Sequence, residues 1–289
     1  MGRGQAVELS ALAAATVYSF LIPFKGGLGV ADAAILFALF VVYAWATARA
    51  PAEEPHLVGP AAAIGALRPA ARRAVTYALF VYAAVAILLS AEPFAAGLVL
   101  SGTLLGIDEF LLVQWLAPLA SEAPEFLVAA LFAWRGMANA GLRTLVASKV
   151  NQWTLLVGTL GLAYSVALGR PADLPLDARQ TEELLLTSAQ SLFALALIAN
   201  FDLSVREATF LLATFLLQLL VPGTEGRLVF AAGYVLAGVA LLAGSRSRRD
   251  SLRQLPVLVR DAVRRPSPTC PAAGVPEARA KALSSPTLD

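Results

Sequence analysis

Long apolar stretches run along most of this chain, and short polar segments separate them. The stretches cover residues 9–24, 30–48, 74–104, 109–134, 142–168, 183–201, 206–221 and 228–244. A helix needs about 20 apolar residues to cross about 30 Å of hydrocarbon. Inside a bilayer a helix satisfies its own backbone hydrogen bonds, so helices are the expected form of these stretches. The pattern therefore predicts an all-α, polytopic membrane helix bundle of about eight spans.

The third stretch is longer than one crossing requires, and it contains Glu92 followed by Pro93. Proline removes a backbone donor, and its ring clashes with the preceding helical turn. We therefore expect a kink or a break in the helix at this position.

The composition agrees with a membrane protein and excludes several other classes. The chain has 289 residues, 58% of them hydrophobic and 15% charged, and its mean hydropathy is +0.71. This is too apolar for a soluble domain. A single cysteine, Cys270, and a single histidine, His56, exclude a disulfide framework and a His or Cys metal cluster. The sequence contains no glycine-rich phosphate loop and no basic aromatic stripe, so neither a cofactor nor a nucleic acid is expected as a partner.

Basic residues gather in three segments, which an eight-span arrangement places on one side of the membrane. The segments are the 49–73 loop, the 135–143 turn and the tail from residue 246. Cytoplasmic loops carry an excess of Lys and Arg. The opposite loops, 170–182 and 222–227, carry acidic residues and fewer basic ones. Both termini are therefore predicted to be cytoplasmic, and the high Ala, Leu and Arg content favours a bacterial plasma membrane.

These features divide the chain into four parts. Residues 1–48 hold two spans, 49–73 form a cytoplasmic loop, and 74–245 form a six-span membrane domain. Residues 246–289 are basic with little periodicity, so we expect a mostly disordered tail. A short helix over 250–263 is expected to lie on anionic lipid.

Two clusters of polar and ionisable residues interrupt the apolar stretches between residues 110 and 168. They are Ser121-Glu122-Ala123-Pro124-Glu125 and Ala147-Ser148-Lys149-Val150-Asn151-Gln152. An ionisable group at the bilayer centre costs about 2.5–3.5 kcal/mol on insertion scales. Groups kept at such a cost indicate an ion pathway, so the two clusters form the candidate site.

The chemistry of the first cluster suits a transported cation. Pro124 interrupts helical hydrogen bonding and frees backbone carbonyls at mid-membrane. Carbonyls, serine hydroxyls and carboxylates are hard oxygen ligands for Na⁺ or Ca²⁺. Glu122 and Glu125 are three residues apart and share a helix face. Antiparallel packing across the short 135–141 turn is expected to bring both clusters to the same depth.

These motifs resemble a known family. Gly106-Ile107-Asp108-Glu109 through Glu125 looks like the first half of an α-repeat of the calcium/cation antiporter superfamily, the sodium/calcium exchangers. Leu145 through Gly158 looks like the second half. The resemblance is motif-specific over about 106–158. It implies a secondary active cation antiporter that works by alternating access, not an enzyme, with Na⁺, Ca²⁺ and H⁺ as partners.

The resemblance implies that Ser121, Glu125 and Ser148 are cation ligands. Two further positions depart from the family pattern, because Glu122 stands where serine is common and Lys149 where Asn or Asp is common. A Lys–carboxylate pair about 4 Å apart is worth about 4 kcal/mol at an effective dielectric near 20, before desolvation. We therefore expect Lys149 to neutralise one glutamate. The other exchanges H⁺ for a cation, which favours Na⁺/H⁺-like exchange over Ca²⁺ exchange.

The full predicted cation and proton site comprises Ser121, Glu122, Glu125, Ser148, Lys149, Asn151 and Gln152. The two glutamates are the predicted metal ligands. Structural alternatives stay open for several members. The glutamates would then be ion-pair partners of Lys149 or Arg143, or Lys149 would reach the interface. Asn151 and Gln152 would serve as interhelical hydrogen-bond partners.

The resemblance also implies ten helices in two inverted halves, each with one α-repeat. This chain shows one such repeat, and the segments 24–34 and 201–209 look like the same place in the two halves. The expected fold is therefore a partial exchanger fold. Two explanations stay open, an N-terminally incomplete chain or a short protein that completes its site with a partner subunit. The alternative function is a non-transporting, exchanger-derived membrane subunit or scaffold.

Overall fold

The structure, a computed structural model, describes residues 3–50, 57, 59–107, 117–221 and 223–264. The described chain is helical apart from short connections and one ribbon of two short strands. This confirms the predicted all-α, polytopic helix bundle. The chain forms two compact units. Unit 1 contains Met1–Ala52 and Val146–Asp289, and unit 2 contains Glu53–Leu145.

Unit 2 holds α3 (Pro60–Gly65), α4 (Pro69–Leu105), α6 (Ala117–Trp134) and most of α7 (Ala138–Asn151). Both α3 and α4 begin with a proline in the first turn, where the missing N–H has no intrahelical partner to lose. Helix α4 ends at Gly106, whose φ of +64° closes the helix. The N–H of Ile107 then donates to the Gly102 carbonyl at 2.9 Å.

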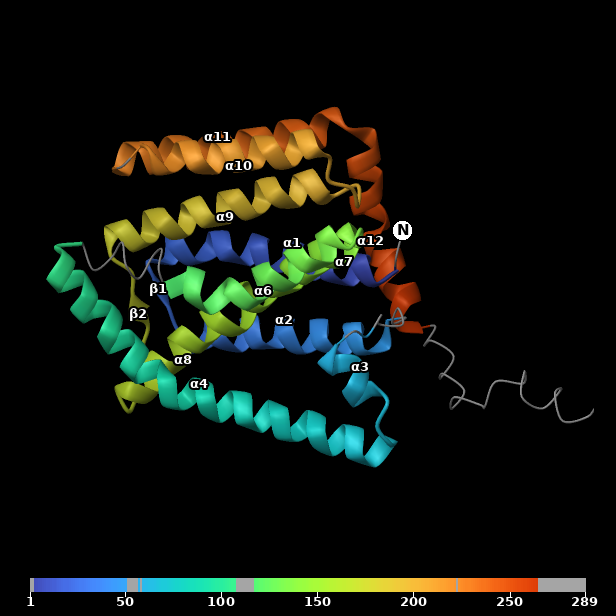
Figure 1. Ribbon diagram of the computed structural model, residues 1–289. Helices are drawn as coiled ribbons and strands as arrows, with labels where there is room; N and C mark the ends of the chain where they lie inside the picture. Colours follow the sequence, from blue (N-terminus) through green and yellow to red (C-terminus); the bar gives the residue numbers. More distant parts are fainter. Residues whose placement is uncertain (1–2, 51–56, 58, 108–116, 222, 265–289) are drawn as a thin grey trace, which may run out of the picture. The chain divides into compact units, whose positions relative to one another are not determined.

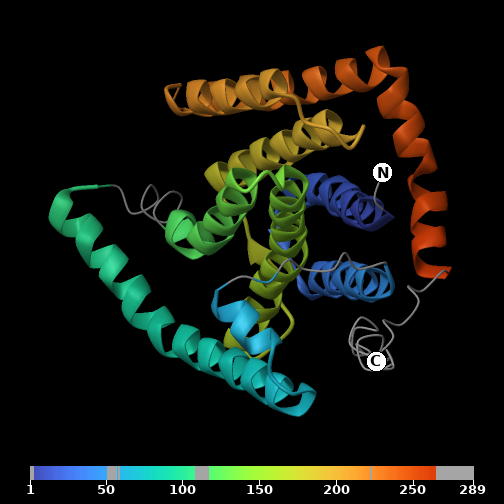
Figure 2. The same ribbon diagram turned by 45° about the vertical axis from the view of Figure 1, so that its right-hand side comes forward.

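Helix α4 is a single helix of 37 residues that passes through Pro93. The helix does not break at Glu92 and Pro93, and it bends along its course, as the expected kink would produce (Figures 1 and 2). An internal proline is a common cause of such a bend, because it removes one hydrogen bond without ending the helix.

Helices α6 and α7 approach each other closely in unit 2. The connection turns at Gly136, which has a φ of +78°. Beyond it, a Cβ on Gly141 would lie 2.8 Å from the carbonyl oxygen of Ala129. A glycine at position 141 therefore allows the two backbones to touch, as small residues do at helix interfaces in membranes.

Unit 1 holds the other helices of the described chain. They are α1 (Arg3–Lys25), α2 (Val30–Arg49), the end of α7, the π-helix η2 (Gln152–Leu156), α8 (Val157–Ala167), α9 (Ala178–Ile198), α10 (Val205–Leu219), α11 (Thr224–Gly244) and α12 (Arg246–Arg264). The strands β1 (Gly27–Leu28) and β2 (Leu174–Pro175) pair in antiparallel fashion. The 142–168 stretch is thus a run of three helical segments, α7, η2 and α8.

The most extensive interface in unit 1 joins α9 and α11 around Phe193 and Tyr234. Two further interfaces build the core around α1. Helices α1, η2 and α9 share a cluster around Leu12, Trp153 and Leu195. Helix α8 packs on the α1–α2 connection through Gly161, where a Cβ would lie 2.9 Å from the carbonyl oxygen of Gly29. Aromatic and aliphatic side chains thus fill the centre, and a glycine permits the closest backbone approach.

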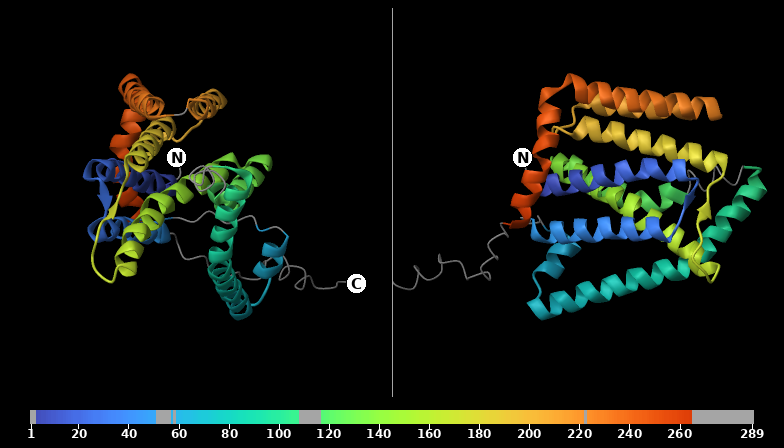
Figure 3. Two further views of the ribbon diagram at one scale, coloured as in Figure 1. Left: turned by 90° about the vertical axis from the view of Figure 1, so that its left-hand side faces the viewer. Right: turned by 180° about the vertical axis from the view of Figure 1, so that it is seen from behind.

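The α1–α2 and α9–α10 connections lie at opposite ends of unit 1 (Figures 1 and 3). Each of the two connections also ends in the same kind of helix cap. The carboxylate of Asp32 accepts from the N–H of Gly29 at 2.9 Å, and that of Glu207 accepts from the N–H of Ser204 at 2.8 Å. In each case an acid three residues into the helix reaches back to the cap residue. These are the two segments that the sequence pointed to as corresponding places of inverted halves.

Five helices of the described chain are long and apolar enough to cross a membrane. They are Gln5–Lys25, Val30–Arg49, Pro69–Leu105, Ala178–Ile198 and Thr224–Gly244. Helix α10 corresponds to the stretch expected at 206–221, but it is only 15 residues long. The four-part division of the chain at 48, 73 and 245 stays a prediction.

Helix α12 crosses the ends of α1, α2 and α11 (Figure 1). It spans Arg246–Arg264 and is longer than the helix expected over 250–263. Ala262 is buried against Val7 of α1 and Ala46 of α2. Its apolar side is therefore occupied by protein. The remainder of the tail, 265–289, lies outside the described residues.

Candidate functional site

The two candidate glutamates lie on α6, which contains Pro124. Glu122 and Glu125 are both half-buried. The Oε2 atom of Glu125 is buried and has no hydrogen-bond partner in the described part of the chain. Nearly all buried polar atoms in proteins are hydrogen-bonded, and an orphaned carboxylate oxygen is costly. The role of Glu125 as a cation or proton ligand stays a prediction, and this unpaired oxygen is the observation that bears on it.

For the other polar residues of the first cluster and its motif, the structure describes no side chains. Asp108 and Glu109 of the motif lie outside the described residues. Ser121 belongs to α6, but only its backbone is described. Its predicted role as a cation ligand stays a prediction.

The second candidate cluster lies at the junction of α7 and η2. Ser148, Lys149 and Gln152 are half-buried, and Asn151 is exposed. The Nζ atom of Lys149 lies 5.5 Å from the ring centroid of Trp153. This is a cation–π contact, which favours the charged ammonium.

Trp153 fixes this junction to the rest of unit 1. Its side chain is 3% exposed, and its Nε1 donates to the Ser191 hydroxyl of α9 at 2.9 Å. The π-helix begins at Gln152, which is the last residue of the polar cluster. A π-helical turn within an α-helix is frequent at functional sites, and it shifts the helix face on which the later side chains lie. The sequence over 152–156, Gln-Trp-Thr-Leu-Leu, gave no signal for it.

The predicted site is divided between the two units of the structure. Glu122 and Glu125 belong to unit 2, and the segment from Ser148 to Gln152 belongs to unit 1. The expected approach of the two clusters therefore stays a prediction. So does the pairing of Lys149 with a glutamate.

The structure reveals a further buried carboxylate, Asp32, at the α1–α2 connection. Asp32 is 2% exposed. It accepts from the Tyr18 hydroxyl at 2.5 Å, from the Gly29 N–H at 2.9 Å and from the Lys25 ammonium. The signal for it in the sequence is the Gly-rich turn followed by an acid three residues into the helix. Three donors satisfy this carboxylate, so it is a structural group.

Helix α1 also carries polar residues toward the interior of unit 1. Glu8 is 7% exposed and Thr16 is 0% exposed. The hydroxyls of Ser10 and Thr16 are buried and have no hydrogen-bond partner among the described residues. The sequence of α1 gives no signal for these groups, because each polar residue is isolated among apolar neighbours in what reads as an ordinary apolar span.

Comparisons with known proteins bear on this arrangement. A family profile described as sodium/calcium exchanger protein matches residues 75–223, which include the α-repeat pattern. A crystal structure titled as the H⁺/Ca²⁺ exchanger CAX is 39% identical in sequence, with a TM-score of 0.83. The match covers 91% of this chain and 67% of that one. A search of curated proteins found no match.

Proposed function

Because this chain belongs to the sodium/calcium exchanger family, we propose that it exchanges protons for a metal cation across the membrane, with Glu125 as the exchanging carboxylate. The family profile matches more than half of the chain, and family membership makes the protein a membrane cation antiporter. The observation that carries the proposal is the buried Oε2 atom of Glu125 without a hydrogen-bond partner in the described structure.

The chemistry follows from the environment of that oxygen. A carboxylate oxygen that the protein leaves without a donor can bind either a proton or a metal cation. A metal cation that arrives replaces the proton, because it compensates the negative charge directly. Pro124 adds to this site, since it has no N–H to donate to the carbonyl of Ala120. That carbonyl is an additional hard oxygen ligand for a cation.

We propose that the remaining candidate residues complete the ligand set. Ser121, Glu122, Ser148, Asn151 and Gln152 supply hydroxyl, carboxylate and amide oxygens. This requires the α7–η2 junction to approach α6, and alternating access requires that the cation reach the site from each side in turn. A disulfide formed between cysteines at 122 and 148, in a Cys270→Ser background, tests the approach. Failure of this pair to cross-link under oxidation, while a pair at 28 and 174, which face each other across the β1–β2 ribbon, does, would contradict it.

Ca²⁺ is the first candidate for the metal cation. The similar solved structure is titled as an H⁺/Ca²⁺ exchanger, and Ca²⁺ prefers sites with several carboxylate oxygens. Na⁺ is the second candidate, and Lys149 favours it. An ammonium that neutralised Glu122 would leave one negative charge, which suits a monovalent ion. We expect Lys149→Asn to raise transport of Ca²⁺ relative to Na⁺ if the second candidate is right, and to leave the ratio unchanged if the first is.

Cation-driven proton movement in proteoliposomes tests the proposed function. The vesicles carry a pH-sensitive dye, and Ca²⁺, Na⁺ or K⁺ is added outside. We expect proton flux with the transported cation, and its loss in Glu125→Gln. Glu92→Gln is the matched control, because Glu92 is an exposed glutamate on α4. Folded wild-type protein that moves no protons with any cation would favour the alternative, a non-transporting subunit or scaffold.

The basic segments support an orientation as well. Arg49, the 135–143 turn and the arginines of α12 carry the positive charge that cytoplasmic sides hold. We propose that both termini face the cytoplasm of a bacterial cell. Labelling of Cys270 from outside intact cells would contradict this orientation.

A further inference from the structure

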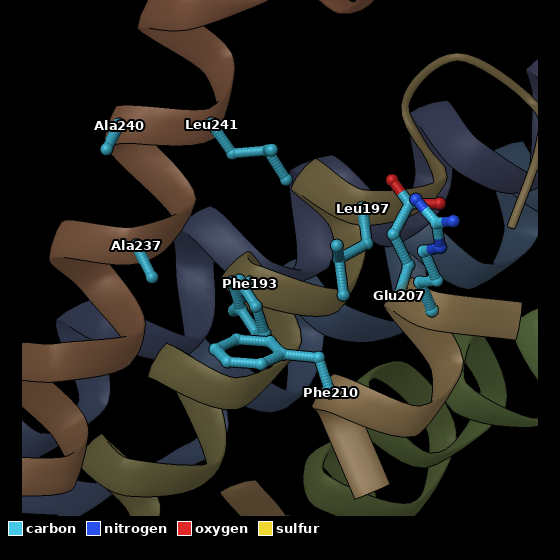
Figure 4. Close-up of a pocket in the computed structure, with 8 residues that line it drawn as sticks. Phe193, Leu197, Glu207, Phe210, Ala237, Ala240 and Leu241 are labelled. Carbon is cyan, nitrogen blue, oxygen red and sulfur yellow. The ribbon is translucent and has the colours of Figure 1, made fainter. Parts of the chain in front are cut away.

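Helices α9, α10 and α11 of unit 1 border a cavity of about 510 Å³ that plays no part in the proposed exchange (Figure 4). Most of its lining is apolar. The apolar lining residues are Phe193, Leu197, Phe210, Ala237, Ala240 and Leu241. The Phe193 and Phe210 rings meet edge to face, with centroids 6.0 Å apart. This volume falls in the range of sites that bind small molecules.

Helix α10 contacts α9 through the Gln190–Gln218 hydrogen bond of 2.6 Å and the Phe193–Phe210 ring pair, and the cavity opens on its side toward α11. None of the residues of α10 is buried. Figure 3 shows α9, α10 and α11 end-on, with α10 separated from α11. Both α9 and α11 are long and apolar enough to cross a membrane, so the cavity lies at hydrocarbon depth. Whatever fills it must be apolar along most of its length.

One end of the cavity is charged. Glu207 lies at that end (Figure 4), and Arg206 also lines it. The carboxylate of Glu207 is already occupied, because it accepts from the Ser204 hydroxyl at 2.7 Å and pairs with Arg248 of α12. In the described part of the chain Arg206 has no ion-pair partner. The charged end therefore has a surplus guanidinium.

The charged end also coincides with the ends of the bordering helices. Helix α9 ends at Ile198, α10 begins at Val205 and α11 ends at Gly244. Arg248 donates to the carbonyl of Leu197 at 3.5 Å, which ties α12 to the same level. Helix ends of membrane spans lie near the lipid headgroups. The cavity thus runs from headgroup level, where it is cationic, into the hydrocarbon.

We propose that this cavity seats one acyl chain of an anionic phospholipid, with the phosphate of that lipid on Arg206. The occupant must combine a long apolar part with a negative end at headgroup level, and an anionic phospholipid has both. Guanidinium groups bind phosphate through paired, charge-assisted hydrogen bonds. The alternative occupant is a segment of a second copy of this chain. To fit the cavity, such a segment would have to present an acidic residue beside an apolar face.

Native mass spectrometry of the full chain in mild detergent tests this proposal. The protein is titrated with phosphatidylglycerol or with phosphatidylcholine of identical acyl chains, and bound lipids are counted. We expect one tightly bound phosphatidylglycerol. Arg206→Gln should weaken its binding about fivefold, the effect of one basic residue near a membrane surface. It should weaken phosphatidylcholine less, because the choline ammonium of that lipid offsets the charge of its phosphate. Arg253→Gln is the matched control, because that side chain is 78% exposed and does not line the cavity.

A second pair of variants tests whether the acyl chain of the lipid lies in this cavity. Ala240→Leu fills the cavity and should remove the bound phospholipid of either headgroup, whereas Ala232→Leu, an exposed position of α11 outside the cavity, should not. Thermal unfolding in lipid-free detergent confirms that both variants are folded. Equal losses in Arg206→Gln and Arg253→Gln would overturn the proposal in favour of diffuse surface attraction. Unchanged lipid binding in Ala240→Leu, or a change of oligomeric state in its place, would overturn it as well.

Discussion

Asp32 and Glu125 are both carboxylates within apolar helices, and their surroundings are opposite. Asp32 receives hydrogen bonds from Tyr18, Lys25 and the Gly29 N–H. Glu125 keeps a buried oxygen without a partner in the described structure. A carboxylate that the fold satisfies belongs to the architecture. One that the fold leaves unsatisfied needs a proton or a cation, which is the property that an exchanger requires.

The largest expected effect is on transport. Glu125→Gln removes the titrating group and keeps the shape, so we expect cation-driven proton flux to fall to the level of empty vesicles. Stability should change by less than about 1 kcal/mol, because the side chain loses no hydrogen bond at Oε2. Flux and thermal unfolding of the same preparation measure both. Normal flux in a folded Glu125→Gln protein would remove the basis of the comparison.

The reverse pattern is expected for Asp32. Asp32→Ala removes a helix cap and leaves the Tyr18 hydroxyl and the Gly29 N–H without their acceptor. We expect a loss of about 3 kcal/mol of stability, since bonds to charged groups are worth about 1.5–3 kcal/mol each and are not additive. Folded molecules should still exchange ions. A stable Asp32→Ala protein without transport would instead make Asp32 part of the ion pathway.

A smaller effect is expected from the interface that holds Trp153. Trp153→Phe removes the Nε1 donor and leaves the buried Ser191 hydroxyl unpaired. We expect a loss of about 1–2 kcal/mol in unfolding free energy, with part of it from the lost volume of the indole. Denaturant unfolding in detergent measures it. The double variant Trp153→Phe with Ser191→Ala should lose less than the sum of the two single variants.

The smallest effect is expected at Lys25. Its side chain is 48% exposed, whereas that of Asp32 is 3% exposed. Water screens the ammonium, so Lys25→Met should cost less than about 1 kcal/mol. The same unfolding assay applies, with Lys25→Arg as the control that keeps the charge. A loss as large as that of Asp32→Ala would mean that the ion pair, and not the cap, holds this connection together.

Hydropathy was sufficient to predict that the apolar stretches are helical, because a chain that crosses a membrane as a helix needs a long apolar run. Five helices of the described chain are long and apolar enough to cross, so the eight expected crossings stay a prediction. Hydropathy did not predict η2, since π-helical turns have no apolar period of their own. Pro93 left open a kink or a break, and α4 continues through this proline with a bend (Figure 1). A helix that loses one hydrogen bond at proline remains intact when its other turns hold it, and the sequence alone does not show which outcome applies.

The candidate site shows a similar division. The polar clusters at 121–125 and 147–152 stand out because ionisable residues are rare in apolar stretches. Asp32 and Glu207 escaped notice as chemistry, since each lies at a helix start, where an acid is ordinary. The partners that decide their roles, Tyr18 for the first and Arg248 for the second, are distant in sequence. Whether a buried group has a hydrogen-bond or ion-pair partner depends on how the helices pack, and only the three-dimensional structure shows it.

The most direct test of the central claim is the number of protons released when a cation binds. Calorimetric titration of the detergent-solubilised protein with Ca²⁺ or Na⁺, in two buffers of different ionisation enthalpy, gives that number. Binding of a cation to a protonated carboxyl site releases about one proton. We predict this release in the wild type and in Asp32→Asn, and none in Glu125→Gln. Undiminished proton release in Glu125→Gln would contradict the account.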